Sequence, residues 1–403
     1  MSDDEKVLGR KIATERRKRG LSQKELGALL DRSETWVSQV ERGVRKIDRM
    51  SVLERIADVL EVPLSELAPT APVVAAATDK PRVVSDLALV LTSSNALRAV
   101  LTRPREVNSA DLESGAVLAW EYAHGSSYEK LGEMLLELIP QLETGARAAA
   151  GDDKKNLFGA LAKTYHAAAA VLSKVGEFAA AWVAADRAIN AAERSDDPLL
   201  MAEGAFRLTL VFQGARWLDL ARTTAETAEE TLSTLDGSAD PAVYSLRGAL
   251  NLQLAVIAAR SDDANEAYAR LEKAARFADE LGADRNDYDT EFGPTNVKLH
   301  EVAVALELGD AGRALRVGEA VNASNLSAER QGRLLIDLAR AHAQRRNVDG
   351  VVSALRSADR IAPEQVRNHP LVRALMDDLG QTAAADDPEF ADLAAQLYAR
   401  PSG

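Results

Sequence analysis

The chain has 403 residues, 46% of them hydrophobic and 28% charged, which is the composition of an ordinary soluble globular protein. It has no cysteine, which excludes disulfides, thiolate zinc sites and a cysteine nucleophile. The formal net charge of -13 argues against a surface that binds nucleic acid everywhere, because such a surface repels phosphate. The segment 9–24 is different, since it holds seven Lys or Arg residues and one Glu.

The N-terminus is acidic and lacks an apolar core, so we expect no signal peptide. No run of about 18 uncharged apolar residues occurs, so we expect no transmembrane helix. These two observations predict a cytoplasmic protein.

Three short helices are predicted near the N-terminus from their end signals. Apolar residues at helical spacing precede Gly20, which is typical of a helix C-cap. Ser22 followed three residues later by Glu25 is a capping box and predicts a second helix. Ser33 is the expected N-cap of a third helix that ends at Gly43.

The third predicted helix has one apolar face and one polar face. Val37 and Val40, three residues apart, should face inward. Two short helices joined by a tight turn, the second with a polar outer face, suit reading of the DNA major groove. The residues left to face outward are Glu34, Thr35, Trp36, Ser38 and Gln39.

This segment resembles the helix-turn-helix of the lambdoid phage repressor and xenobiotic-response-element regulator family. The resemblance covers residues 7–67 and implies a five-helix domain that binds double-stranded DNA, usually as a homodimer. The matching residues are Leu21, Ser22, Gln23, Glu25, Leu26, Gly27, Ser33, Val37, Ser38, Val40, Glu41, Arg42 and Gly43.

The resemblance also implies roles for single residues. Gln23 would contact phosphate, and Arg16 would pair with Glu41 to hold the helices together. Gln39 can pair with adenine and Glu34 can accept from the cytosine amine. Glu34 departs from the family pattern, because a carboxylate near phosphates weakens binding unless it finds a donor.

Trp36 is also unusual, and two interpretations stay open: contact with DNA, or a half-buried place on the domain face. The basic residues after the third helix lie where phosphate contacts would fall, although solvated surface charges are the alternative. The predicted DNA-binding residues are Gln23, Ser33, Glu34, Thr35, Trp36, Ser38, Gln39, Arg42, Arg45 and Lys46.

The sequence predicts where the first domain ends. An apolar stripe from Met50 to Leu60 and a short helix after Pro63 complete a domain of residues 1–67. Residues 68–83 contain three prolines and few large apolar residues, which indicates a linker.

Residues 84–403 are predicted to be helical throughout, so the fold class is all-α. Polar turns followed by small residues at spacings of four and three resemble the tetratricopeptide repeat, although the signature of its first helix is largely missing. An antiparallel helical-pair solenoid is therefore expected, with residues 84–150 helical, an N-cap at Ser109 and no repeat assigned there. The repeat turns lie at Gly176, Asp262, Gly309 and Arg346, with a weaker copy around Ala221.

Stacked helix pairs curve into a groove lined by the first helix of each pair. The predicted lining mixes apolar, amide and charged side chains, which could grip a peptide, although such residues can equally pack between repeats. The candidate ligand-binding residues are His166, Phe206, Gln213, Asn296, Arg333 and Arg340.

A helix-turn-helix followed by such a body resembles the bacterial peptide-sensing regulators of the quorum-sensing type. The resemblance implies a transcription regulator in which a peptide, small ligand or partner in the solenoid changes the dimer and hence DNA binding. The alternative is an adaptor whose repeats recruit another protein, with DNA binding secondary.

An enzyme is not expected, and neither is a metal or cofactor. The five histidines form no HExxH motif. No phosphate loop, GxGxxG after a strand or GxSxG elbow occurs. The many carboxylates on helices are expected to be solvated.

Overall fold

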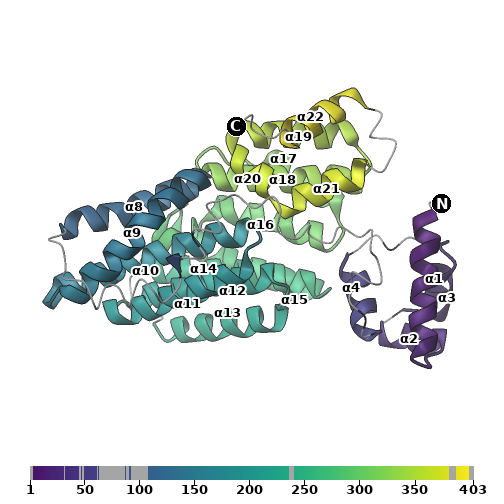
Figure 1. The fold of residues 1–403 in the computed structure, drawn as a ribbon, viewed down its shortest axis with the longest axis horizontal. Coiled ribbons are helices and arrows are strands. Elements are labelled where there is room, and N and C mark those ends of the chain that lie inside the picture. Colours follow the sequence, from purple (N-terminus) through teal and green to yellow (C-terminus); the bar gives the residue numbers. More distant parts are fainter. Residues whose placement is uncertain are drawn as a thin grey trace. The chain divides into compact units, whose positions relative to one another are not determined.

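The structure, a computed structural model, describes residues 3–30, 32–44, 47, 50–60, 62, 87, 90–91, 108–235, 240–380 and 387–398. Among these residues it is helical apart from turns, short loops and one isolated antiparallel bridge between Arg285 and Phe292. The chain divides into two compact units, residues 1–80 and 81–403 (Figure 1). The all-α class predicted from the sequence is confirmed.

The first unit is a small helical domain around one apolar core. The predicted helix after Pro63 and the linker 68–83 lie outside the described residues. The helices are α1 (Asp3–Lys18), α2 (Gln23–Leu29), α3 (Glu34–Glu41) and α4 (Met50–Val59). Their buried core consists of Ile12, Leu26, Leu30, Val37, Val40, Ile56, Ala57 and Leu60.

From residue 108 onwards, the described part of the second unit consists of six antiparallel helix pairs and three final helices (Figure 1). The pairs are α8 (Ser109–His124) with α9 (Tyr128–Ala148), α10 (Gly151–Lys174) with α11 (Phe178–Ser195), α12 (Pro198–Gly214) with α13 (Leu218–Ser233), α14 (Pro241–Arg260) with α15 (Ala264–Leu281), α16 (Pro294–Glu307) with α17 (Ala311–Ala320), and α18 (Ala328–Gln344) with α19 (Val348–Ile361). The final helices are α20 (Pro363–Asn368), α21 (Pro370–Gly380) and α22 (Pro388–Tyr398).

One turn geometry joins the two helices of every pair. A residue with positive φ follows the first helix, and its N–H bonds to the carbonyl three residues back, as Gly176 does to Ser173 at 3.2 Å. The next N–H bonds five residues back, as Glu177 does to Leu172 at 2.8 Å, which completes a Schellman motif. The six positive-φ residues are Ser126, Gly176, Arg216, Asp262, Gly309 and Arg346.

The structure sharpens the repeat prediction in two places. The α8–α9 segment, which no repeat pattern covered, is a helix pair with the same turn at Ser126. The N-cap of α8 is Asn108 rather than Ser109, because the Asn108 Oδ1 accepts from the N–H of Ala110 at 3.1 Å. The prediction was one residue off because both side chains can cap a helix.

Small residues let the paired helices approach closely. In α11, Ala181, Ala185 and Ala188 are fully buried against α10, and Ala267 and Ala274 occupy the same role in α15 against α14. A larger side chain at these places would push the helices apart, because protein interiors are close-packed.

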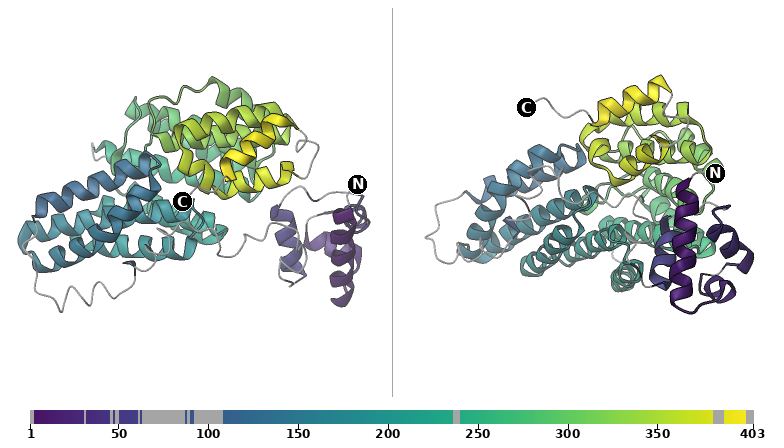
Figure 2. Two further views of the ribbon diagram at one scale, coloured as in Figure 1. Left: turned by 45° about the horizontal axis from the view of Figure 1, so that its top comes forward. Right: turned by 45° about the vertical axis from the view of Figure 1, so that its right-hand side comes forward.

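The first helices of the pairs form an inner layer that closes on itself. Each of α8, α10, α12, α14, α16 and α18 contacts the next first helix, and α18 also contacts α8. Figure 2 shows the blue α8 beside the yellow-green C-terminal helices. The closure includes an ion pair of 3.1 Å between Lys174 and Glu329, and a hydrogen bond of 2.9 Å from the Glu129 N–H to Glu364.

Among the described residues, α14 is long and apolar enough to cross a membrane. Its apolar window is 94% buried inside the second unit, where it contacts α12, α13, α15 and α16. Packing among these helices therefore accounts for its apolar character.

Candidate nucleic-acid interface and body cavity

A buried polar cluster fixes α2 and α3 against α1. Arg16 donates to both carboxylate oxygens of Glu41, from Nε at 2.5 Å and from Nη2 at 3.0 Å. Its Nη1 donates to the Leu21 carbonyl at 2.6 Å, and the Gln23 amide donates to Glu41 at 2.6 Å. The hydrogen bond to Glu41 raises the pKa of Arg16. The predicted Arg16–Glu41 pair is confirmed, and Gln23 shares the same carboxylate.

Two glycines allow the backbones of this domain to approach. A Cβ atom on Gly9 of α1 would lie 2.4 Å from the carbonyl oxygen of Val40 in α3. A Cβ atom on Gly27 would lie 2.7 Å from the Arg32 carbonyl oxygen in the turn after α2. Both distances are too short for any side chain, so these glycines set the spacing between α1, α2 and α3.

Both predicted caps of the helix-turn-helix are confirmed. The Ser22 Oγ accepts from the Glu25 N–H at 3.1 Å, and the Glu25 carboxylate accepts from the Ser22 N–H at 2.7 Å. The Ser33 Oγ accepts from the Trp36 N–H at 3.1 Å at the start of α3. Accepting this bond leaves the Ser33 hydroxyl able to donate its own proton.

The two faces of α3 are those expected from the sequence. Val37 and Val40 are buried in the core. On the opposite face Glu34 and Thr35 are exposed at the helix start, while Ser38 and Gln39 are partly exposed. The exposed side chains therefore stand on a helix whose position is held from beneath by Glu41 and the valines.

The remaining predicted interface residues differ in exposure. Trp36 is half-buried and packs against the domain core, with the Arg32 guanidinium 5.9 Å from its ring centroid. Arg42 is exposed and donates from Nε to the Ser38 carbonyl at 3.1 Å. Arg45 and Lys46 lie outside the described residues.

In the body, the six predicted ligand residues do not line one open groove. His166 is 0% exposed, Phe206 and Asn296 are 1% exposed and Gln213 is 5% exposed, so these four side chains lie inside the packed layers. Arg333 and Arg340 are partly exposed. Both bind Asp337, at 3.0 and 2.9 Å.

Polar groups fill the interior between the inner helices. Burial raises the pKa of Glu203 to about 8 although Arg207 lies 3.4 Å from it. Burial, helped by the charge of Arg207, lowers the pKa of His166 to about 3, so the ring is neutral. Neither ring nitrogen of His166 has a hydrogen-bond partner within the described part of the chain.

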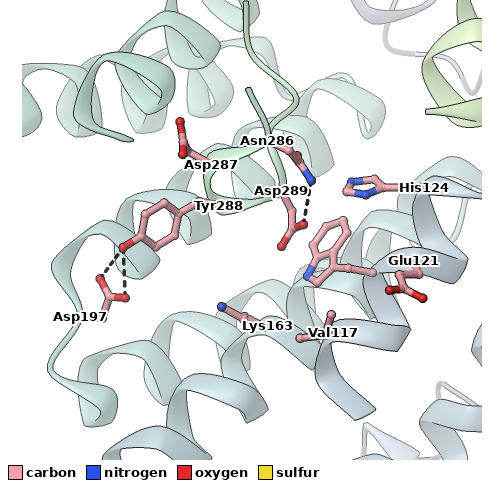
Figure 3. A pocket seen from close by; sticks show the side chains of 10 residues that line it. Val117, Glu121, His124, Lys163, Asp197, Asn286, Asp287, Tyr288 and Asp289 are labelled. Atoms are coloured by element: carbon pink, nitrogen blue, oxygen red, sulfur yellow. Dashed lines mark hydrogen bonds between the residues drawn. The ribbon is translucent and has the colours of Figure 1, made fainter. Parts of the chain in front are cut away.

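The body has a cavity of about 410 Å³ between α8, α10, the start of α12 and the loop 282–293 that precedes α16 (Figure 3). Its lining combines aromatic, acidic and basic side chains. None of the lining residues is among the six candidate ligand-binding residues predicted from the sequence. The lining residues are Val117, Trp120, Glu121, His124, Lys163, Asp197, Asn286, Asp287, Tyr288 and Asp289.

The loop 282–293 is strained and firmly anchored. It contains the short 3-10 helix η1 (Asp287–Asp289), and Tyr288, Asp289 and Glu291 all have φ near +50°. Such conformations cost about 1–3 kcal/mol each for residues other than glycine and persist only where the surroundings impose them. Here Arg207 donates to the Asp289 carbonyl at 2.6 Å, and the Tyr288 hydroxyl lies 3.2 Å from the Asp197 carboxylate.

The sequence held a weak signal for this loop. The two helices within each pair are joined by tight turns, whereas residues 282–293 form a long polar stretch bounded by Gly282 and Gly293. Long loops in compact domains are often functional. No comparable sign in the sequence indicated that α8 lines the cavity, because α8 reaches it only through the curvature of all the helix pairs together.

Comparison with known proteins adds a family for the first unit. A family model described as a helix-turn-helix domain matches residues 7–69. A search of curated proteins finds no match.

Three solved structures are similar to the chain at low identity. PlcR from Bacillus thuringiensis, in complex with a peptide and DNA, is 19% identical with a TM-score of 0.33, covering 69% of this chain and 96% of that chain. ComR from Streptococcus suis is 12% identical with a TM-score of 0.20, covering 71% and 93%. ComR from S. thermophilus, with DNA and its signalling peptide, is 14% identical with a TM-score of 0.18, covering 74% and 99%. The match of residues 7–69 and the geometry of α1–α4 together identify the first unit as a helix-turn-helix domain.

Proposed function

We propose that this protein is a cytoplasmic, sequence-specific DNA-binding transcription regulator that acts as a homodimer. Its helical body would control DNA binding through a peptide, small ligand or partner protein. The observation that carries the DNA-binding part is the exposed polar face of α3, held rigidly by the Arg16–Glu41–Gln23 cluster on a helix-turn-helix domain.

The geometry of this face fits readout of base edges. An α-helix fits the major groove, where polar side chains distinguish base pairs by their donors and acceptors. Thr35, Ser38 and Gln39 supply such groups, and Glu34 can accept from a cytosine amine. Ser33 and Gln23, near the helix starts, and Arg42, Arg45 and Lys46 after α3 would contact the backbone.

The charge distribution assigns the DNA contact to the first unit. The chain carries a net charge of -13, but the segment 9–24 is strongly basic. The phosphates of DNA are therefore attracted to the N-terminal domain and repelled by the acidic body. A single domain of this size makes few base contacts, which is why a dimer on two half-sites is proposed.

The reading face can be tested on DNA sites that the protein itself selects. Sites are first selected from a random DNA pool with the full-length protein, and affinities are then measured by fluorescence anisotropy over a salt series. A Thr35→Ala, Gln39→Ala double variant should lose about 10- to 100-fold in preference for the selected site over random DNA, because a good base contact contributes about 1–3 kcal/mol.

Thr14→Ala on α1 is the matched control, because its side chain is exposed away from α3 and should leave the preference unchanged. Undiminished discrimination by the double variant, in a protein with unchanged helicity, would contradict the proposed reading face. Equal binding of wild-type protein to every DNA in the pool would contradict sequence-specific binding itself.

A second function, that of an adaptor that recruits another protein, is favoured by one surface feature. Trp182 and Trp217 are each 46% exposed on the outer helices, with their rings edge-to-face at 5.7 Å. Exposed tryptophans of this kind are frequent anchors of protein interfaces. Co-purification of a stable partner that a Trp182→Ala, Trp217→Ala variant loses, with operator affinity unchanged by any ligand, would favour the adaptor.

A further inference from the structure

We propose that the cavity between α8, α10 and the loop 282–293 binds a small zwitterion, namely a free amino acid with an apolar or aromatic side chain. Lys163 would hold its carboxylate and Asp289 its ammonium group. This inference deepens the proposed function by naming a ligand class and its site. Only the expected effect of the ligand on DNA binding rests on the proposed function.

Two unpaired opposite charges face the same space. Lys163 extends from α10 and Asp289 from the loop, and Figure 3 shows both side chains reaching into the space between these elements. Among the described residues Lys163 forms no ion pair, and Asp289 accepts only a long hydrogen bond of 3.4 Å from the Asn286 amide. Burial raises the pKa of Asp289 more than the nearby cations lower it. The charges of His124, Arg207 and Lys163 act on Asp289 from a distance, but no direct ion pair to its carboxylate is formed among the described residues, so a zwitterion could supply one.

Two of the other carboxylates that line the cavity, Asp197 and Asp287, are already occupied, whereas Glu121 is exposed on α8. Asp197 caps α12 through the Leu199 N–H at 3.0 Å and lies 3.2 Å from the Tyr288 hydroxyl. Asp287 accepts from Arg285 at 2.7 Å and from the Ser245 hydroxyl at 2.6 Å. Asp197 and Asp287 are therefore weaker candidates than Asp289 for the ligand ammonium.

The cavity also has an apolar and aromatic wall. Trp120 is 5% exposed, lines the cavity, and its indole N–H has no hydrogen-bond partner among the described residues. Val117 and Tyr288 line the same cavity, so an apolar or aromatic side chain has surfaces to contact.

The size of the cavity favours a single amino acid over a longer ligand. About 410 Å³ lies near the lower end of the range of about 300–1,000 Å³ for small-ligand sites. The cavity is also flanked by the anchored loop, whose Tyr288 and Asp289 have φ of 49° and 54°.

The position of the cavity links ligand binding to the closure of the inner layer. Arg207 of α12 donates to the Asp289 carbonyl at 2.6 Å, and Arg330 of α18 donates to the neighbouring Thr290 carbonyl at 3.2 Å. A ligand on Asp289 therefore contacts the loop that α12 and α18 share. A ligand can control DNA binding only if it binds one arrangement of these helices more tightly than another.

The experiment is isothermal titration calorimetry of the full-length protein, without DNA, against each of the twenty free amino acids. We expect binding of one or a few apolar or aromatic members. The N-acetyl derivative and the methyl ester of that amino acid each lack one charge and should bind at least 10-fold more weakly. Lys163→Met and Asp289→Asn should each weaken binding of the free amino acid at least 10-fold.

Lys130→Met is the matched control, because Lys130 is an exposed lysine of α9 outside the cavity. Circular dichroism confirms that each variant keeps its helicity. No binding by any of the twenty, or equal binding of the free amino acid and its two derivatives, overturns the inference, as does wild-type affinity in both cavity variants. If the amino acid binds as expected but operator affinity does not change, the ligand site stands and ligand control of DNA binding fails.

Discussion

Polar side chains are exposed to solvent on α3 of the first unit, whereas on the inner helices of the second unit they are buried against one another. On α3 the side chains of Glu34 and Thr35 face solvent, and the only ion pair beneath them in the described core is Arg16–Glu41. On α12 and α18 the polar side chains turn towards one another, as in the buried Arg207–Glu203 pair and in Arg340 with Asp337.

The difference follows from what surrounds each helix. α3 is packed on one side only, so its polar face stays available to an external partner. The inner helices of the body form a layer that closes between α8 and α18, so their polar faces meet each other. Buried polar groups must find partners within the protein. Charged side chains of the body that form no ion pair among the described residues, such as Lys163 and Asp289, therefore point to a site for an external ligand.

The largest effect is expected for loss of the buried Arg16–Glu41 pair in the first unit. Glu41→Gln leaves the Arg16 guanidinium buried without a counter-ion and also weakens the Gln23 contact. The opening free energy of α1–α3 should fall by about 3 kcal/mol, the lower end for breaking one partner of a buried pair. Hydrogen exchange of the full-length protein, resolved by segment, measures it.

Glu34→Gln removes an exposed carboxylate from the same helix and should change stability by less than about 0.5 kcal/mol. Equal protection of α1–α3 in wild-type protein and the Glu41 variant would show that the pair does not hold this domain together.

A smaller effect is expected at the closure of the inner layer, where several charges share the interior. Burial opposes the charge of Glu329, but Lys174 and Arg330 outweigh it and lower its pKa to about 2. Lys174→Met removes one of these two cations, so the free energy of unfolding should fall by about 2 kcal/mol, less than for a pair with a single partner. Urea unfolding followed by circular dichroism measures the loss.

Lys154→Met, at an exposed position near the start of α10, is the matched control and should leave the urea midpoint unchanged. A Lys174 variant as stable as this control would mean that α10 and α18 are not held together by this contact.

The neutral buried histidine of the body predicts a pH effect. The pKa of His166 is about 3 in the folded protein, below its ordinary value of 6.5, mainly because of burial. Its contribution to stability is therefore present above pH 6.5 and is lost as the pH falls towards 3. Between pH 7.5 and 5.5 this residue alone should cost wild-type protein about 1.4 kcal/mol.

His166→Leu removes the titrating group, so the pH dependence of the urea midpoint should become shallower by that amount. Parallel pH profiles of the two proteins would contradict the neutral buried state of this ring.

The smallest effect is expected at the start of α3. Ser33→Ala removes the acceptor for the Trp36 N–H and should destabilise the first unit by about 1 kcal/mol. Ser38→Ala, in the middle of the same helix, should be neutral or slightly stabilising because alanine is the better helix former. Hydrogen exchange of α3 distinguishes the two, and equal effects would show that the Ser33 cap contributes nothing.

Local signals in the sequence predicted much of the first unit and part of the second. The caps at Ser22 and Ser33 and the inward valines needed only neighbours a few residues away. The turns at Gly176 and Gly309 were visible because glycine adopts a positive φ readily. The turn at Ser126 was missed because the helix after it has Leu131, Leu135 and Leu138 at the positions where the helix after Gly176 has alanines.

The predicted groove shows the limit of helical periodicity. Projection of one face of each first helix selected His166, Phe206, Gln213 and Asn296, which the folded protein buries. Periodicity reports which side of a helix is distinctive, but not whether a neighbouring helix covers that side. That depends on how far the array curves, which sums small packing angles over six pairs.

The amino-acid sequence alone therefore determined the helices, their caps, most of the pair turns and the polar face of α3, because each depends on contacts within a few residues. The tertiary structure decided which polar side chains of the body are buried and which remain open. It brought α8, α10 and the loop 282–293 together from distant parts of the chain, and so placed Lys163 opposite Asp289. Long-range closure of the inner layer, rather than any local pattern, is the physical reason.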